Sequence, residues 1–324
     1  MERRQIVLSS THVDRHGEMM TKEALEMGAE TINSGRRPRI GVEHDMTLPP
    51  LGRISNAEVI QGEDGEYYLV AYQEFFDSAE ELELADGEIV VREYFSTGGT
   101  PFAEVQTETS EIIVISIDPQ NFENYKDADS FYSELQNESE IEFKKLGLSR
   151  KSFISDPEIV FQLAENYIYL FFGYKLAKKI LKKTTNKLAN KVSDDLAGTY
   201  DLIKKGVAKM IKRANPKDRP ITYIFEFPAP IQIELIAIDK TPDEIVNSLK
   251  TDTLKKLEKK LDELTYKFDT EKIQFELNDQ NKWELNYLLT VNGESIGTKK
   301  SISKRTVALE NTIKKTLERK KKKK

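Results

Sequence analysis

Two short segments, roughly fifty residues apart, carry the residue types that nucleophilic catalysis requires. The first reads Val42-Glu43-His44-Asp45, and the second reads Glu93-Tyr94-Phe95-Ser96-Thr97-Gly98-Gly99. A serine hydroxyl is a weak nucleophile until a neighbouring base takes its proton, and histidine suits that role at neutral pH. Backbone N–H groups in the glycine-rich stretch would suit an oxyanion. The pattern favours Ser96 as a nucleophile and His44 as its general base.

Both residues also have a structural interpretation. An isolated histidine is more often a surface residue or a hydrogen-bonded one than a catalytic base, and this chain holds three histidines. A serine beside glycines is most often a turn residue, because both residue types favour turn conformations. The residue types alone therefore do not decide between catalysis and a turn.

The order of several motifs resembles that of the tailed-phage prohead (capsid maturation) serine proteases. The motifs are Asp14-Arg15-His16-Gly17-Glu18, Glu43-His44-Asp45, Leu51-Gly52-Arg53 and Gly62-Glu63-Asp64-Gly65-Glu66, within residues 6–125. The resemblance implies an assemblin-like fold, with His44 as general base and Ser96 as nucleophile in a "Phe-Ser-x-Gly" segment. It also implies limited cleavage of the chain itself or of a partner or scaffold protein. The expected setting is the cytoplasm of a bacterial host or a virion precursor, with no cofactor.

The third catalytic residue is less clearly marked. The family places an acidic residue or a histidine near the start of the strand before a "Pro-Ala-Asn"-like turn, which here points to Glu111, with Glu108 and Ser116 as fallbacks. Glu111 stands one residue out of the usual register to the proline, and its interval from Ser96 is short. This departure supports an alternative: a catalytically inactive, protease-like binding or sensor module, for example in antiphage defence.

The charge distribution predicts a division of the chain. Residues 1–150 hold 13 Lys and Arg against 31 Asp and Glu, whereas residues 151–324 hold 36 against 24. Such asymmetry indicates a domain boundary. We expect a prohead-protease-like domain at 1–122, an irregular acidic linker at 123–156 and a basic α+β domain of unknown role at 157–324. The absence of cysteine excludes disulfides and cysteine nucleophiles and fits an intracellular setting.

The first half has the pattern of a β-rich domain. Strands are predicted at 5–11, 39–42, 54–60, 67–75, 89–95 and 111–117, with a helix at 22–34 capped by Thr21 and a short helix at 78–85. Many strands with few helices predict a barrel or rolled sheet.

The second half has the pattern of an α+β domain. Helices are predicted from Pro157 to about Arg213, from Thr241 to about Leu264 and over 301–319, and strands at 221–227, 231–238, 273–277, 283–291 and 294–300. Asn292-Gly293 predicts a hairpin turn. We expect a mainly antiparallel sheet with long helices.

A lysine-rich run in the second half suggests contact with a polyanion. It contains Lys175, Lys178, Lys179, Lys182, Lys183, Lys187 and Lys191. A solvated helix face is the simplest interpretation, and binding to an anionic membrane or to nucleic acid are the alternatives. His12 and His16 lie four residues apart, but no clear third ligand accompanies them, so no metal site is expected. The sequence leaves oligomerisation open.

Overall fold

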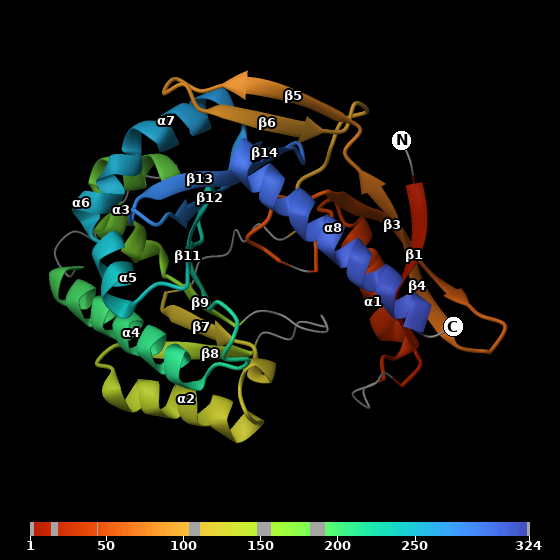
Figure 1. Cartoon of the computed structure of the whole chain (residues 1–324), viewed down its shortest axis with the longest axis horizontal. Coiled ribbons are helices and arrows are strands. Elements are labelled where there is room, and N and C mark those ends of the chain that lie inside the picture. The colour runs from red at the N-terminus through yellow and green to blue at the C-terminus, as the bar shows by residue number, and fades with distance from the viewer. Residues whose placement is uncertain are drawn as a thin grey trace. The chain divides into compact units, whose positions relative to one another are not determined.

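The computed structural model describes residues 3–13, 19–43, 45–103, 111–147, 157–181 and 192–322 (Figure 1). The chain forms two compact units. Unit 1 combines Met1–Val105 with Leu288–Lys324, and unit 2 is Gln106–Tyr287. This division differs from the one drawn from charge and composition, because the C-terminal strand and helix belong with the N-terminal strands. The mixed α+β class is confirmed.

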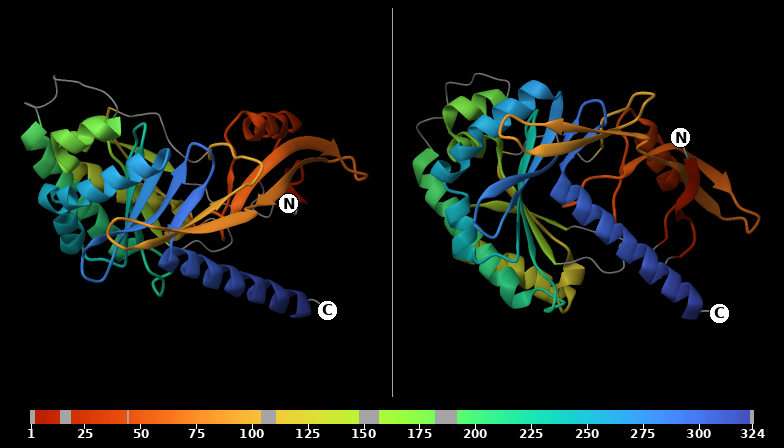
Figure 2. Two further views of the ribbon diagram at one scale, coloured as in Figure 1. Left: turned by 90° about the horizontal axis from the view of Figure 1, so that it is seen from above. Right: turned by 45° about the horizontal axis from the view of Figure 1, so that its top comes forward.

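The described residues of unit 1 form two groups of strands and two helices. The elements are β1 (Arg3–Ser10), α1 (Lys22–Asn33), β2 (Arg39–Ile40), β3 (Gly52–Gln61), β4 (Tyr67–Phe75), β5 (Ser78–Glu83), β6 (Ile89–Tyr94), β14 (Ser295–Thr298) and α8 (Lys299–Lys322). An antiparallel, curled sheet has the order β1-β4-β3-β2 (Figure 2). Strand β6 pairs antiparallel with β5 on one side and with β14 on the other.

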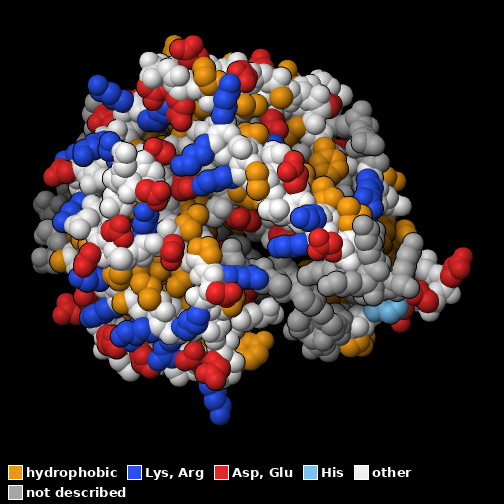
Figure 3. All heavy atoms as spheres, in the orientation of Figure 1, with side chains coloured by type: hydrophobic (Ala, Val, Ile, Leu, Met, Phe, Trp, Pro, Cys, Tyr) orange, Lys and Arg blue, Asp and Glu red, His pale blue; other side chains and the backbone are white. Residues whose placement is uncertain are grey.

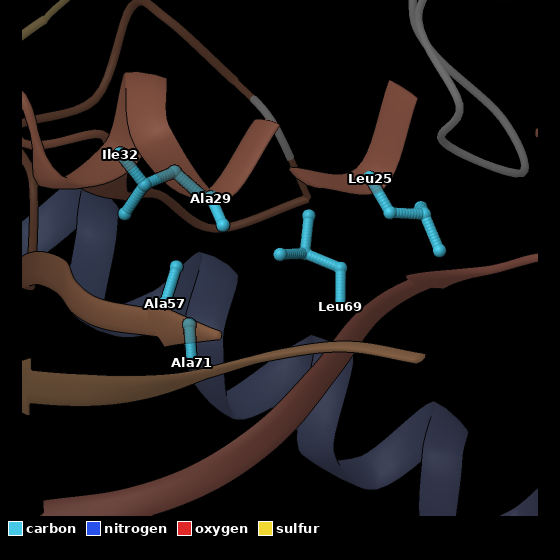
Figure 4. Packing of buried hydrophobic residues seen from close by; sticks show 6 residues of the cluster. All are labelled: Leu25, Ala29, Ile32, Ala57, Leu69 and Ala71. Carbon is cyan, nitrogen blue, oxygen red and sulfur yellow. The ribbon is translucent and has the colours of Figure 1, made fainter. Parts of the chain in front are cut away.

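Helix α1 forms where the sequence predicts it. Thr21 caps the helix, because its hydroxyl accepts a hydrogen bond from the Ala24 N–H at 3.2 Å. Three residues at helical spacing point from α1 toward small and aliphatic side chains of β3 and β4 (Figure 4). This cluster consists of Leu25, Ala29, Ile32, Ala57, Leu69 and Ala71. It forms the hydrophobic core between α1 and the curled sheet.

The helix predicted over 78–85 is wrong, because this segment is strand β5. It pairs with β6 from Ser78 opposite Tyr94 to Glu83 opposite Ile89. Its Ala, Glu and Leu residues favour a helix, but an isolated helix needs about 12–15 residues to be stable in water. Strand pairing therefore overrides local propensity here.

Unit 2 is built on a seven-strand run with helices on one side (Figures 1 and 2). The strands are β7 (Ile113–Ile117), β8 (Phe143–Gly147), β9 (Glu158–Gln162), β10 (Thr222–Phe227), β11 (Gln232–Ile238), β12 (Thr270–Leu277) and β13 (Trp283–Thr290), which passes into unit 1 at Leu288. The helices are η1 (Pro119–Asn121), α2 (Tyr125–Glu138), α3 (Glu165–Leu181), α4 (Val192–Arg213), α5 (Pro242–Ser248), α6 (Thr251–Leu254), η2 (Lys255–Leu257) and α7 (Glu258–Lys267).

The sheet of unit 2 is mixed, with parallel pairs beside the antiparallel ones that the sequence predicts. Its strand order is β13-β12-β11-β10-β9-β7-β8. The pairs β9–β10, β11–β12 and β7–β8 are parallel, whereas β10–β11 and β7–β9 are antiparallel. Parallel neighbours require long connections, and helices of unit 2 lie in each of these three crossovers.

Aromatic residues pack the helices onto one face of this sheet. The rings of Phe161 on β9 and Phe225 on β10 are stacked, with centroids 5.4 Å apart. Phe171 and Phe172 of α3 both contact Phe227 edge-on. Residues 158–162 were predicted to be helical, but this segment, which contains β-branched and aromatic residues, forms strand β9.

Among the residues described, no helix has the length and apolar character needed to cross a membrane.

The described part of the predicted acidic linker, residues 123–147, holds α2 and β8. Arg213 of α4 pairs with Asp127 and Glu134 of α2. Lys209 of α4 pairs with Glu134 at 3.1 Å and with Glu138 at 2.8 Å, and these cations lower the pKa of Glu134. Acidic and basic side chains are interspersed over these helices (Figure 3). The acidic stretch is therefore ordered against a basic helix of its own unit.

Candidate functional site

Ser96 lies in an exposed turn directly after β6. The Gly98 N–H donates to the Phe95 carbonyl at 2.9 Å, and Gly98 has a φ of 87°. The Ser96 hydroxyl donates to Oδ2 of Asp77 at 3.0 Å, and the Ser96 N–H donates to Oδ1 at 2.8 Å. These bonds lower the pKa of Asp77, with the backbone bond as the largest cause. The N–H groups of Ser96 and Gly98 are thus both hydrogen-bonded, one to Asp77 and one within the turn.

Gly99 allows the backbone after Ser96 to lie close to the backbone at Asn292 and Gly293. A Cβ on Gly99 would lie 1.8 Å from the Asn292 carbonyl oxygen, and a Cβ on Gly293 would lie 2.1 Å from the Thr100 carbonyl oxygen. Gly293 has a φ of 68° in the turn between β13 and β14, and its N–H donates to the Thr290 carbonyl. The predicted hairpin turn at Asn292-Gly293 is therefore confirmed, and it packs against the segment that follows Ser96.

His44 itself lies outside the described residues, but the connection that carries it is described on both sides. Arg39, which is buried, donates to the carbonyl of Asp45 at 3.0 Å and to that of Leu48 at 3.3 Å. The Asp45 carboxylate accepts from the N–H and the hydroxyl of Thr47. Glu43 has a φ of 49°, which is uncommon for a residue with a side chain. A buried arginine thus organises the connection from β2 to β3.

Arg53, the second residue of β3, joins this connection to the segment around Ser96. Its guanidinium stacks on the Phe95 ring at 4.1 Å from the centroid. It also pairs with Glu74 at 2.7 Å and donates to the Thr100 hydroxyl at 3.3 Å. Glu74 is only 1% exposed. One side chain therefore contacts residues on both sides of Ser96.

Arg305 of α8 makes a second link between the same two segments. Its Nη1 atom donates to the Pro50 carbonyl, which lies in the connection from β2 to β3. The guanidinium also makes two hydrogen bonds of 2.7 Å to the Glu93 carboxylate on β6. Arg305 is 5% exposed. Pro50 in the β2–β3 connection and Glu93 on β6 are consequently neighbours in unit 1.

The other candidate catalytic residues are not brought to Ser96 by any described contact. Glu111 is exposed and lies just before β7 in unit 2, whereas Ser96 belongs to unit 1. Ser116 is buried within β7, and Glu108 lies outside the described residues. The third member therefore stays a prediction.

The lysine-rich run is only partly described. Lys178 on α3 is exposed, whereas Lys182, Lys183 and Lys187 fall outside the described residues. Nothing is described of the Lys175 and Lys179 side chains.

The histidine pair is also only partly described. The His12 imidazole lies 3.4 Å from the Asp64 carboxylate, and His16 lies outside the described residues. Across the described ranges, no group of three or more His, Asp and Glu side chains could hold a metal ion.

A row of polar side chains crosses the sheet of unit 2, and the sequence did not lead us to predict it. In register, Gln162 of β9 pairs with Glu226 of β10, which pairs with Glu234 of β11, which pairs with Gln274 of β12. Residues at matched positions of neighbouring strands lie on one face of a sheet. Part of the signal was present, because Glu226 stands between Phe225 and Phe227 and Gln274 precedes Phe275, but Val160, Ile224 and Ile236 interrupt the polar positions of the same face.

The centre of this polar row is a buried hydrogen-bonded network. Lys272 pairs with Glu234, and their side chains are 1% and 5% exposed. Gln274 donates to Glu234 at 2.7 Å and accepts from Asn286 at 2.7 Å, and Gln232 donates to Glu234 at 3.2 Å. A buried network of this kind rigidifies its strands when its members are satisfied. We interpret it as a structural core of the sheet.

Comparison of the chain with protein-family models, with curated proteins and with solved structures gave no match.

Proposed function

We propose that the chain is a serine peptidase of prohead-protease type, with Ser96 as nucleophile and His44 as general base. The observation that carries this proposal is the pair of links made by Arg53 and Arg305, which hold the β2–β3 connection beside the segment around Ser96. A base must come within hydrogen-bond reach of the nucleophile, and neighbouring segments meet the first condition for that. The assemblin-like fold and the role of Glu111 belong to this proposal.

The proposed reaction begins with a change at Ser96. Its hydroxyl leaves Asp77, and His44 takes the hydroxyl proton while Ser96 Oγ attacks a peptide carbonyl. The protonated His44 then gives the proton to the leaving amine, and water hydrolyses the acyl-enzyme by the same base. An exposed hydrogen bond to a carboxylate is modest in strength, so its loss does not prevent this step. The substrate is a protein, either a partner or the chain itself.

A fluorophosphonate probe, which forms a covalent bond with an activated serine, tests the proposal. We expect labelling of the full chain at Ser96 by peptide mass spectrometry and its loss in Ser96→Ala. Thr97→Ala is the matched control, because Thr97 is an exposed hydroxyl residue in the same turn. Intact mass over time reports self-cleavage in parallel. An unlabelled Ser96 in folded protein would overturn the proposal.

A second candidate function is a non-catalytic module that keeps the protease-like arrangement. The observation that favours it is the engagement of Ser96, whose hydroxyl and N–H both bind Asp77 while the Gly98 N–H closes the turn. Under this alternative Ser96 is a turn residue, and unit 1 recognises a protein without cutting it. The same labelling experiment separates the two candidates.

A further inference from the structure

The C-terminal helix α8 contacts both segments that carry the proposed catalytic pair. Arg305 bonds the Pro50 carbonyl, 255 positions away in sequence, and the Glu93 carboxylate, 212 positions away. Two helical turns further along, the Thr312 hydroxyl is shared between Glu43 Oε1 at 3.1 Å and the Ala308 carbonyl at 3.0 Å. Glu43 directly precedes His44. One helix therefore reaches the base segment at two points and the nucleophile strand at one.

The chemistry of arginine suits this bridge. A guanidinium is planar and always charged, and it presents its donors in a rigid fork that matches a carboxylate. Here the fork binds Glu93, whose side chain is 15% exposed, while Nη1 also reaches Pro50. Burial keeps water from competing for these bonds, so Arg305 helps to fix the spacing between Pro50 and Glu93. Lysine would keep the charge but could not hold both partners in a fixed plane.

The backbone beside His44 is held in an unusual conformation. Glu43 has a φ of 49°, a region that costs energy for a residue with a Cβ. Such conformations persist only where the surroundings impose them. The Asp45 N–H donates to the Val42 carbonyl at 2.9 Å and closes the backbone turn across Glu43, while the Thr312 hydroxyl bonds the Glu43 side chain.

We infer that Arg305 is a positioning residue for the proposed His44–Ser96 pair, so that helix α8 is part of the catalytic unit. The inference rests on the proposed peptidase function and adds a requirement to it. Proton transfer from Ser96 depends on a base held at a fixed distance, and a shift of about 1 Å can cost about a hundredfold in rate. Arg305 acts through this distance and touches no substrate.

Fluorophosphonate labelling of the full chain over a range of probe concentrations tests the inference. The saturating rate reports how well Ser96 is activated, whereas the half-saturating concentration reports probe binding. We expect Arg305→Lys to lower the saturating rate about tenfold to a hundredfold and to leave the half-saturating concentration unchanged. Lys314→Ala, an exposed position on the same helix, is the matched control and should match the wild type.

The loss of a well-fitted buried arginine can also unfold a protein, so two further measurements accompany the rates. Circular dichroism and thermal melting establish the folded fraction of each variant. Thr312→Val, which removes the hydroxyl that bonds Glu43 and the Ala308 carbonyl but leaves Arg305 in place, should lower the saturating rate less than Arg305→Lys does. Equal saturating rates in folded Arg305→Lys and wild type would overturn the inference and leave the peptidase proposal intact. Absence of wild-type labelling at Ser96 would overturn both.

Discussion

The Asp77 carboxylate holds Ser96 through two hydrogen bonds, 2.8 Å from the backbone nitrogen and 3.0 Å from the hydroxyl. The Ser96 hydroxyl has a single donor hydrogen, so while it donates to Asp77 it cannot donate to His44. The pKa of Asp77 is lowered by these same bonds, so its carboxylate is a weak base at neutral pH. In the proposed peptidase, the hydrogen bond from the Ser96 hydroxyl to Asp77 must therefore break before Ser96 can transfer its proton to His44.

Replacing Asp77 by asparagine should make Ser96 more reactive. The amide of Asp77→Asn can still accept from the Ser96 N–H, but its NH₂ donates to Ser96 Oγ, which frees the hydroxyl proton. We expect the rate of fluorophosphonate labelling to rise by about threefold to tenfold, the weight of one exposed hydrogen bond. Asp86→Asn is the matched control, since Asp86 accepts a comparable backbone bond from Glu88 in an exposed turn. An unchanged rate in Asp77→Asn would show that Asp77 does not restrain Ser96.

The bond from Asp77 to the Ser96 backbone should be lost on acidification. A carboxylate whose pKa is lowered in the folded state stabilises that state above its ordinary pKa, and this contribution disappears as pH falls through the lowered value. We expect the ¹⁵N–¹H resonance of Ser96 to titrate with a midpoint below 3.8. In Asp77→Asn this titration should vanish. A Ser96 midpoint at or above 3.8 in the wild type would contradict the hydrogen bond.

The buried pair of Lys272 and Glu234 should matter strongly for stability. Lys272→Met leaves the Glu234 carboxylate buried without its cation, which costs about 3–5 kcal/mol of unfolding free energy. The double variant Lys272→Met with Glu234→Gln should recover part of that loss, because no buried charge remains. Lys282→Met, at an exposed position, should change stability by less than about 0.5 kcal/mol. Urea unfolding measures all three, and equal effects of Lys272→Met and Lys282→Met would refute the buried network.

Because the Ser96 segment packs against the β13–β14 turn, substitution of Gly293 should lower the free energy of unfolding. Gly293→Ala adds backbone strain at a φ of 68° and places Cβ 2.1 Å from the Thr100 carbonyl oxygen. Gly65→Ala is the matched control, because Gly65 has a φ of 84° but open space around the added Cβ. We expect Gly65→Ala to cost about 1–2 kcal/mol and Gly293→Ala clearly more. Similar costs in denaturant unfolding would argue against the close approach.

Local signals in the sequence predicted those elements whose ends are fixed by their own side chains. Thr21 caps α1, and Thr241 with Glu244 forms a capping box at α5. Gly293 lies in the positive-φ position of the turn that Asn292-Gly293 marks. Each of these features depends on residues within a few positions of one another, so the sequence suffices.

Features that depend on residues far apart in the chain could not be predicted from the sequence. The segment that forms β5 contains helix-favouring residues, and only its pairing with β6 makes it a strand. Within the predicted linker, helix α2 is held by Lys209 and Arg213 of α4. Similarly, Asp77 lies 19 positions before Ser96 and no local pattern links them. The role of Arg305 could not be predicted for the same reason, because its partners are more than 200 positions away.

The most direct test of the account is the pH dependence of Ser96 labelling with and without His44. If His44 is the general base, the wild-type rate should rise with pH as the imidazole loses its proton and then level off. In His44→Gln the rate should fall by at least about a hundredfold and this rise with pH should disappear. His12→Gln, which changes an exposed histidine beside Asp64, should behave like the wild type. A His44→Gln variant that labels at the wild-type rate with the same pH profile would contradict the account.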